Sequence, residues 1–201
     1  MSTQHNPEQD QTPLDAVDKP VQYGGFWRRA AAHLIDALIL VPVVIVLVLI
    51  GHGVETLFLP LLVAQGCIGI AYQLYLTTRY GATFGKKAMK LRIVKIDGSA
   101  ITFKEANLRY LPYALFALVT VLGNIVAFNH LPVPSIFFDA SFAQRNLMLQ
   151  QHQPFWAVLA SLLAIIFALI DLLTLLFHGK KRSLHDQIGE TMVIKLPSES
   201  A

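Results

Sequence analysis

The sequence contains few charged residues and a single cysteine. Only 14% of its 201 residues are Asp, Glu, Lys or Arg, whereas about a quarter is typical of soluble domains. Too few charges remain to solvate the surface of a globule of this length, so lipid must cover much of that surface. The one cysteine, Cys67, lies in an apolar run, which excludes a disulfide framework and a cysteine-based metal site.

The sequence also lacks the motifs of an enzyme. The glycine-rich segment Gly81–Lys86 does not have the spacing of a Walker A loop, and no strand-like segment leads into it. His178 and His185 are seven residues apart across a basic turn, which argues against a metal site. No nucleophile is paired with a base. We therefore expect no enzymatic activity, no cofactor and no metal.

What the sequence does contain is four long apolar runs. A helix needs about 20 residues to cross a hydrocarbon core of about 30 Å, and each run meets that requirement. Aromatic residues lie near the ends of the runs, as an interfacial aromatic belt requires. The sequence therefore predicts an all-α membrane protein, a bundle of four transmembrane helices at residues 26–50, 57–76, 108–128 and 155–177.

The basic residues indicate the orientation of the chain. Of the 16 Lys and Arg residues, all but Arg145 flank the apolar runs on one predicted face. Because positively charged loops stay in the cytoplasm, we expect a multi-pass protein of the bacterial inner membrane with both termini cytoplasmic. The same placement argues against nucleic acid as a partner. Lys86, Lys87 and Lys90 are expected to face the phosphates of membrane lipids.

The connection between the second and third runs has a pattern of its own. Leu91–Ile96 is strand-like, Asp97-Gly98 is a strong turn signal, and Ile101–Phe103 is able to return. We expect a short cytoplasmic β-hairpin lying against the membrane. In the outer connection, Ser135–Gln150 is expected to form a short amphipathic helix.

Three parts of the chain are predicted from these patterns. Residues 1–22 are polar and proline-containing, and we expect them to form a disordered cytoplasmic tail. Residues 23–195 form the transmembrane domain, and residues 196–201 form a C-terminal tail.

Ionisable side chains inside a membrane span are costly, so each is a functional hypothesis. Arg29, His33 and Asp36 are spaced i, i+4, i+7 and share one face of the first helix. Asp171 is in the fourth helix. Asp36 and Asp171 each lie six residues inside the expected inner boundary, about 9 Å deep at 1.5 Å per residue. At that matched depth the two carboxylates are able to meet.

The meeting of two carboxylates has a chemical consequence. Two desolvated carboxylates that lie close together share a proton, because both cannot ionise cheaply, whereas a nearby arginine keeps one of them charged. A cation/proton exchange site needs that balance. The alternative is that Arg29 pairs with Asp36 or Asp171 only to lock the helices together. A third possibility is that the Asp171 side chain extends to the inner interface.

Three motifs agree in order with a known family. Phe26–Asp36, residues 81–98 and Lys181–Thr191 resemble the RDD family of bacterial integral membrane proteins, named for one arginine and two aspartates. The resemblance implies that Arg29 is the arginine, that Asp36 is the first aspartate, and that Asp186 or Asp171 is the second. It implies a membrane domain for which transport is the usual suggestion, and cation/proton antiport has been proposed for a member.

Asp186 also has a physical interpretation of its own. It follows a basic turn just beyond the fourth span, where we expect it to pair with Arg29 or to cap the segment that ends at Ile194. The alternative is an ordinary surface salt bridge, worth about 0–1 kcal/mol.

Two functional hypotheses follow. The first is a small transporter, acting as a homo-oligomer, that exchanges Na⁺ or K⁺ for H⁺ at Asp36 with Asp171 or Asp186, tuned by Arg29. The second is a non-transporting scaffold or assembly factor whose basic face holds anionic lipid or a protein partner. The buried carboxylates favour the first. The absence of a pair of broken helices of the transporter type favours the second.

Overall fold

The computed structural model describes residues 22–197. Residues 1–21, where we expect a disordered tail, lie outside the described residues, as do residues 198–201 of the expected C-terminal tail. The remainder of the chain contains all four predicted spans.

Four helices are long and apolar enough to cross a membrane. They are α1 (Phe26–Gly53), α2 (Phe58–Tyr80), α4 (Phe103–Asn129) and α7 (Phe155–Phe177). The four predicted runs are thereby confirmed as helices. The third span begins at Phe103 rather than near residue 108, because Thr102 and Glu105 form a capping box that satisfies the first N–H groups of α4.

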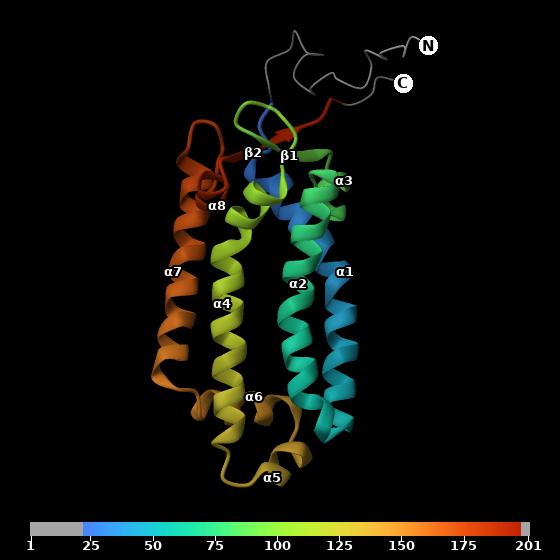
Figure 1. Cartoon of the computed structure of the whole chain (residues 1–201), viewed down its shortest axis with the longest axis vertical. Coiled ribbons are helices and arrows are strands. Elements are labelled where there is room, and N and C mark those ends of the chain that lie inside the picture. Colours follow the sequence, from blue (N-terminus) through green and yellow to red (C-terminus); the bar gives the residue numbers. More distant parts are fainter. Residues whose placement is uncertain (1–21, 198–201) are drawn as a thin grey trace, which may run out of the picture.

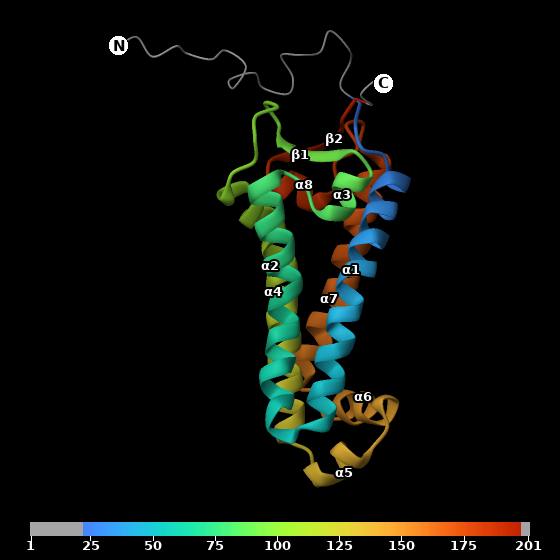
Figure 2. The same cartoon turned by 90° about the vertical axis from the view of Figure 1, so that its right-hand side faces the viewer.

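The four spans pack as neighbours in a row. α1 packs on α2, α2 on α4, and α4 on α7, and Figure 1 shows α7 and α1 at the two ends of this row. Seen from the side, α1 diverges from α2 and α4 toward one end of the molecule (Figure 2). Two short helices, α3 (Phe84–Ala88) and α8 (Leu184–Ile188), lie between the spans at that end.

The same end carries a small sheet. β1 (Leu91–Lys95) and β2 (Thr191–Lys195) are antiparallel, with Leu91 opposite Lys195. We call residues 81–102 and 178–197 the cap, and this end of the spans the cap end. The prediction of a hairpin between the second and third spans is wrong about the second strand. β1 pairs with the C-terminal strand β2 rather than with residues 101–103.

The path of the chain after β1 explains this correction. The turn at Asp97-Gly98 is present, with Gly98 at φ +85°, but the returning chain makes a single bridge, from Ala100 to Val94. Thr102 then caps α4. The residues that a second hairpin strand needs are therefore used to begin the helix, and β2 supplies the backbone partners of β1.

The cap has an apolar core that joins it to the spans. Leu91, Ile93 and Val193 are each at most 1% exposed and pack with Ala32 of α1 and Ala106 of α4. A two-stranded sheet is marginally stable on its own. Burial of this face against the spans therefore stabilises the sheet and fixes the cap over them.

The opposite end, which we call the loop end, carries α5 (Pro134–Asp139), α6 (Phe142–Gln151) and the 3-10 turn η2 (Glu55–Leu57). The single helix expected at 135–150 is two helices. The chain breaks there because Ser141 forms the N-cap of a new helix, with its side chain accepting from the backbone N–H of Gln144.

Candidate functional site

Asp186 in α8 forms the most buried ion cluster of the cap. Its side chain is fully buried, and its two oxygens accept from Arg29 of α1 and Arg109 of α4. Burial by itself raises the pKa of a carboxyl group, but the positive charges of Arg109 and Arg29 outweigh it and hold the pKa of Asp186 well below its usual range. The surface salt bridge considered from the sequence is therefore wrong, and the pairing with Arg29 is correct.

Both arginines make further contacts to the cap. Arg29 donates to the carbonyl oxygens of Gly24 at 2.8 Å and Lys181 at 2.6 Å. Arg109 donates to Thr191 Oγ1 at 2.8 Å. The cluster thus joins the first and third spans to the chain on both sides of α8. Removing one member of such a cluster leaves a buried charge without its partner.

Asp36 of α1 is held by a second, separate set of donors. The hydroxyl groups of Tyr72 and Thr83 donate to it at 2.8 and 2.7 Å, and the backbone N–H of Gly85 donates at 2.8 Å. The side chain of Asp36 is buried among them. These contacts attach α3 to α1, so Asp36 positions the first half of the cap as Asp186 positions the second.

The contact between α3 and α1 requires a glycine. A Cβ atom at Gly85 would lie 2.0 Å from the carbonyl oxygen of Ala32, which is much closer than van der Waals contact allows. Gly85 therefore lets the backbone of α3 approach α1 closely enough for its N–H to reach Asp36.

Asp171 of α7 is bound by His185 of α8. The Nδ1 atom of His185 lies 2.7 and 2.9 Å from the two Asp171 oxygens, and the backbone N–H of His185 donates to Asp171 at 2.8 Å. The hydroxyl group of Tyr113 donates to the same carboxylate at 3.3 Å. The fourth span is thereby attached to the cap by an aspartate–histidine pair.

The tautomer of His185 follows from its other neighbour. Arg109 lies 2.9 Å from His185 Nε2, and a guanidinium is only a donor, so Nε2 accepts and the ring proton is on Nδ1, facing Asp171. Burial and the nearby charge of Arg109 lower the pKa of His185, which keeps the ring neutral near pH 7. A proton added at Nε2 would face Arg109 and break this contact.

A cavity of about 320 Å³ lies beside this pair, between the spans and the cap. Its volume is within the range of small-molecule sites. The wall is rich in ionisable and hydrogen-bonding side chains, which are unusual in an apolar bundle: His33, Gln73, Lys86, Arg109, Tyr110, Tyr113, Asp171 and His185. Among residues 22–197, no group of three or more His, Cys, Asp or Glu side chains is placed to hold a metal ion.

Lys86 is the least expected member of this wall. The sequence predicts that Lys86, Lys87 and Lys90 face lipid, but Lys86 is only 2% exposed and lines the cavity, so that prediction is wrong for it. The Thr83 side chain accepts a hydrogen bond from the backbone N–H of Lys86 and so caps the first turn of α3, from which the Lys86 side chain extends inward. Burial lowers the pKa of Lys86 below its usual range. Lys87 and Lys90 are exposed.

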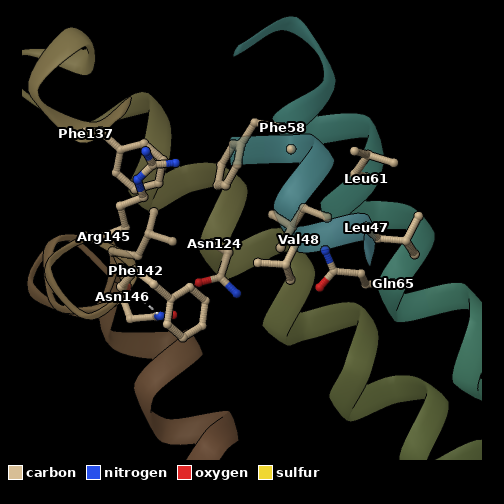
Figure 3. Close-up of a pocket in the computed structure, with 13 residues that line it drawn as sticks. Leu47, Val48, Phe58, Leu61, Gln65, Asn124, Phe137, Phe142, Arg145 and Asn146 are labelled. Carbon is tan, nitrogen blue, oxygen red and sulfur yellow. Dashed lines mark hydrogen bonds between the residues drawn. The ribbon is translucent and has the colours of Figure 1, made fainter. Parts of the chain in front are cut away.

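A second pocket, of about 120 Å³, lies at the loop end. Figure 3 shows the amide groups of Gln65, Asn124 and Asn146 around it, together with the ring of Phe58. Arg145 also lines it, and its guanidinium donates to the carbonyl oxygens of Ala140, at 2.8 Å, and Phe138. Arg145 therefore closes the turn between α5 and α6 at the edge of the pocket.

The structure thus separates the residues that the sequence predicts to form a single site. Arg29 binds Asp186 rather than Asp36 or Asp171. Asp36 and Asp171, which the matched depth allows to meet, are each bound to different partners. His33 lies on the cavity wall with Asp171.

The sequence interpretation missed Arg109, and it considered His185 only as a metal ligand. Arg109 is fully buried and takes part in both the Asp186 cluster and the cavity wall. A signal for it existed, because it lies within the third apolar run. Because it is the second residue of the run predicted at 108–128, the sequence does not distinguish it from the basic residues of the preceding loop.

The fold is that of a membrane protein with a polar cap and four helices that are long and apolar enough to cross a bilayer. A sequence model of the RDD family matches residues 23–190. The chain therefore belongs to the RDD family. No curated protein and no solved structure matched the chain significantly.

Proposed function

We propose that this protein is a small proton-coupled ion transporter whose coupling site is the cavity at the cap end. The observation that carries the proposal is a polar cavity whose wall includes ionisable side chains from five different elements: His33 on α1, Lys86 on α3, Arg109 on α4, Asp171 on α7 and His185 on α8. Ionisable groups inside a membrane domain are costly and typically mark ion pathways and proton relays.

The proton step is assigned to the Asp171–His185 pair. The ring of His185 is a donor to Asp171 and an acceptor from Arg109. Protonation at Nε2 requires Arg109 to withdraw, so the protonation state of the pair is linked to the arrangement of the cavity wall. A transporter needs such a link between a proton and the shape of its site.

A pathway across the membrane is supported by the positions of the two pockets. On α2, Gln65 lines the loop-end pocket and Gly69 lines the cap-end cavity. These residues are one helical turn apart, about 6 Å along the helix axis. On α4, Asn124 and Tyr113 bound the two pockets, about 16 Å apart by the same rise. The part of the protein that separates the two pockets is therefore thinner beside α2 than beside α4.

The sequence predicts exchange of Na⁺ or K⁺ for H⁺, and the geometry narrows which carboxylate could serve that reaction. Each oxygen of Asp186 accepts from an arginine, and the Asp36 carboxylate accepts from three donors. Asp171 alone among the three lines the cavity. A monovalent cation exchanged by this protein would therefore bind at Asp171, in place of the hydrogen bond that His185 donates to it.

The orientation and assembly belong to the same proposal. The cap end carries the basic loops, so we place it in the cytoplasm at the inner membrane. Because the spans form a row with α1 and α7 at its ends, a second copy could cover the side that the row leaves open, as expected for a homo-oligomer. The proposal assigns no covalent chemistry to the site.

The test is proton movement in proteoliposomes that contain the purified protein and a trapped pH dye. We expect an imposed ion gradient to change the internal pH with wild type, and Asp171→Asn and His185→Gln to reduce the rate at least tenfold. Asp139→Asn, which removes an exposed carboxylate at the loop end, is the matched control and should behave as wild type. No proton movement under Na⁺, K⁺ or anion gradients would reject the transporter.

One observation favours the scaffold as a second candidate. Lys87 and Lys90 are exposed at the cap end, where each basic residue would contribute roughly 1 kcal/mol toward anionic lipid. We expect Lys87→Gln with Lys90→Gln to reduce co-purified anionic lipid in a salt-sensitive way. An unchanged lipid content would count against this candidate.

A further inference from the structure

The cap-end cavity presents hydrogen-bond donors that have no acceptor. Within residues 22–197, no hydrogen bond is formed by the Lys86 ammonium group, which is on the wall of the cavity and buried. Arg109 Nε is also without a partner, but it has no accessible surface and does not face the cavity. Buried polar groups in proteins are normally paired, and an unpaired buried cation is especially costly. An ammonium group without an acceptor on a cavity wall indicates a missing partner that accepts hydrogen bonds.

The neighbouring side chains do not supply that acceptor. Asp171 is already bound to His185 and Tyr113. The oxygen of the Gln73 amide accepts from Tyr110 at 3.1 Å, which leaves the NH₂ group of Gln73 as a second donor without a partner among the described residues. The wall therefore offers two donor groups without a partner, the Lys86 ammonium and the Gln73 amide, whereas its carboxylate, Asp171, is already bound.

We propose that this cavity binds a small oxyanion, a carboxylate or phosphate group, held by the Lys86 ammonium group and the Gln73 amide beside the Arg109 guanidinium. The inference rests on the proposed transport function and names its ion. It replaces the monovalent cation of the sequence prediction, because a cation would face the Lys86 ammonium group, whereas an oxyanion accepts a hydrogen bond from it. Charge-assisted hydrogen bonds of this kind are the strong ones in proteins.

Binding of the anion is coupled to protons. Burial lowers the pKa of Lys86 in the empty cavity, and a bound anion favours the protonated amine, so the anion binds more tightly as the pH falls. The groups that face Lys86 set the strength of this coupling: Asp36 and His33 on α1, Arg109 and Tyr110 on α4, Asp171 on α7, and His185 and Asp186 on α8. The anion and a proton would then cross together.

The first experiment measures binding without transport. The full chain is reconstituted in nanodiscs of zwitterionic lipid, and thermal unfolding is followed while sodium phosphate or sodium acetate is added, with sodium chloride at equal ionic strength as reference. We expect a saturable rise in the unfolding midpoint with phosphate or acetate, and roughly tenfold or weaker binding for Lys86→Gln. Lys87→Gln removes the same charge from the exposed neighbour on α3 and should bind as wild type.

Further variants keep the result interpretable. Lys86→Arg retains the charge and should retain binding, so it separates loss of the site from loss of the fold. An equal phosphate response in wild type and Lys86→Gln, or a response no greater than that to chloride, would overturn the proposal. A sodium-dependent rise that is unchanged in Lys86→Gln would also overturn it, in favour of a cation.

Anionic lipid is the second source of the same chemistry. In nanodiscs with phosphatidylglycerol, a lipid phosphate in the cavity would abolish the response to free phosphate, and mass spectrometry would find retained lipid on wild type and Lys87→Gln but not on Lys86→Gln. That outcome keeps the oxyanion site and assigns it to lipid. Phosphate binding without proton movement supports this inference and rejects transport, whereas proton movement without anion binding rejects this inference alone.

Discussion

Arg29 and Arg109, from the first and third spans, bind opposite oxygens of the same carboxylate, that of Asp186. This shared contact is the main polar link between the spans and the second half of the cap, and it also fixes where Arg109 lies on the cavity wall. The site therefore depends on a carboxylate, that of Asp186, which does not itself line the cavity.

The Asp186 cluster should be essential for stability. Asp186→Asn leaves two buried arginines without a negative partner, and we expect it to lower the free energy of unfolding by about 3–5 kcal/mol. Reversible unfolding in mixed micelles measures the change. Asp139→Asn, at an exposed position, should change it by less than about 0.5 kcal/mol. A loss below about 1 kcal/mol for Asp186→Asn would show that the cluster is not what holds the cap.

The close approach of α3 to α1 predicts a steric effect at Gly85. Gly85→Ala places a methyl group 2.0 Å from the Ala32 carbonyl oxygen, so we expect destabilisation of about 1–3 kcal/mol and faster proteolysis of the cap. Gly69→Ala on α2, where a Cβ atom meets nothing within 4 Å, is the control. It should be neutral or slightly stabilising, because alanine favours helix. Equal effects of the two changes would contradict this packing.

Lys86 should carry a cost in stability when no ligand is present. Lys86→Met replaces a buried amine that has no hydrogen-bond partner among the described residues by an apolar side chain of similar length. We expect it to raise the free energy of unfolding by about 1 kcal/mol or more in phosphate-free buffer. Lys87→Met, at the exposed neighbour, should leave stability nearly unchanged. Destabilisation by Lys86→Met would mean that the amine has a structural partner.

The stability of the protein should depend on pH through His185. The folded-state pKa of His185 is lowered by burial and by Arg109, so folding favours the neutral ring. The contribution of His185 is fully present above its unfolded pKa of about 6.5 and is lost as the pH falls from there through the folded pKa. Unfolding midpoints between pH 8 and pH 5 measure this.

His185→Gln should make the decline of the midpoint below pH 6.5 shallower. His130→Gln, at an exposed histidine of the loop end, should keep the slope of wild type. A slope that His185→Gln leaves unchanged would assign the titration to another group.

Much of the architecture was predictable from local composition. The four spans and the aromatic residues at their ends follow from the apolar runs, and the RDD motifs were recognisable in the sequence, as the match to residues 23–190 confirms. Burial of a span in lipid depends on the summed hydrophobicity of one contiguous segment. Such a property can be read from the chain without knowing what the segment contacts.

The pairing of polar groups was decided only by the tertiary structure. The contact of Arg109 with Asp186, the strand that pairs with β1 and the burial of Lys86 each depend on segments that are far apart in the sequence and are brought together by helix packing. Periodicity places Arg29 and Asp36 on one face of a helix, but it contains no information about which distant donor reaches that face. A lysine near a membrane surface has the same local sequence whether it faces lipid or a cavity, and the direction in which α3 packs on α1 decides between them.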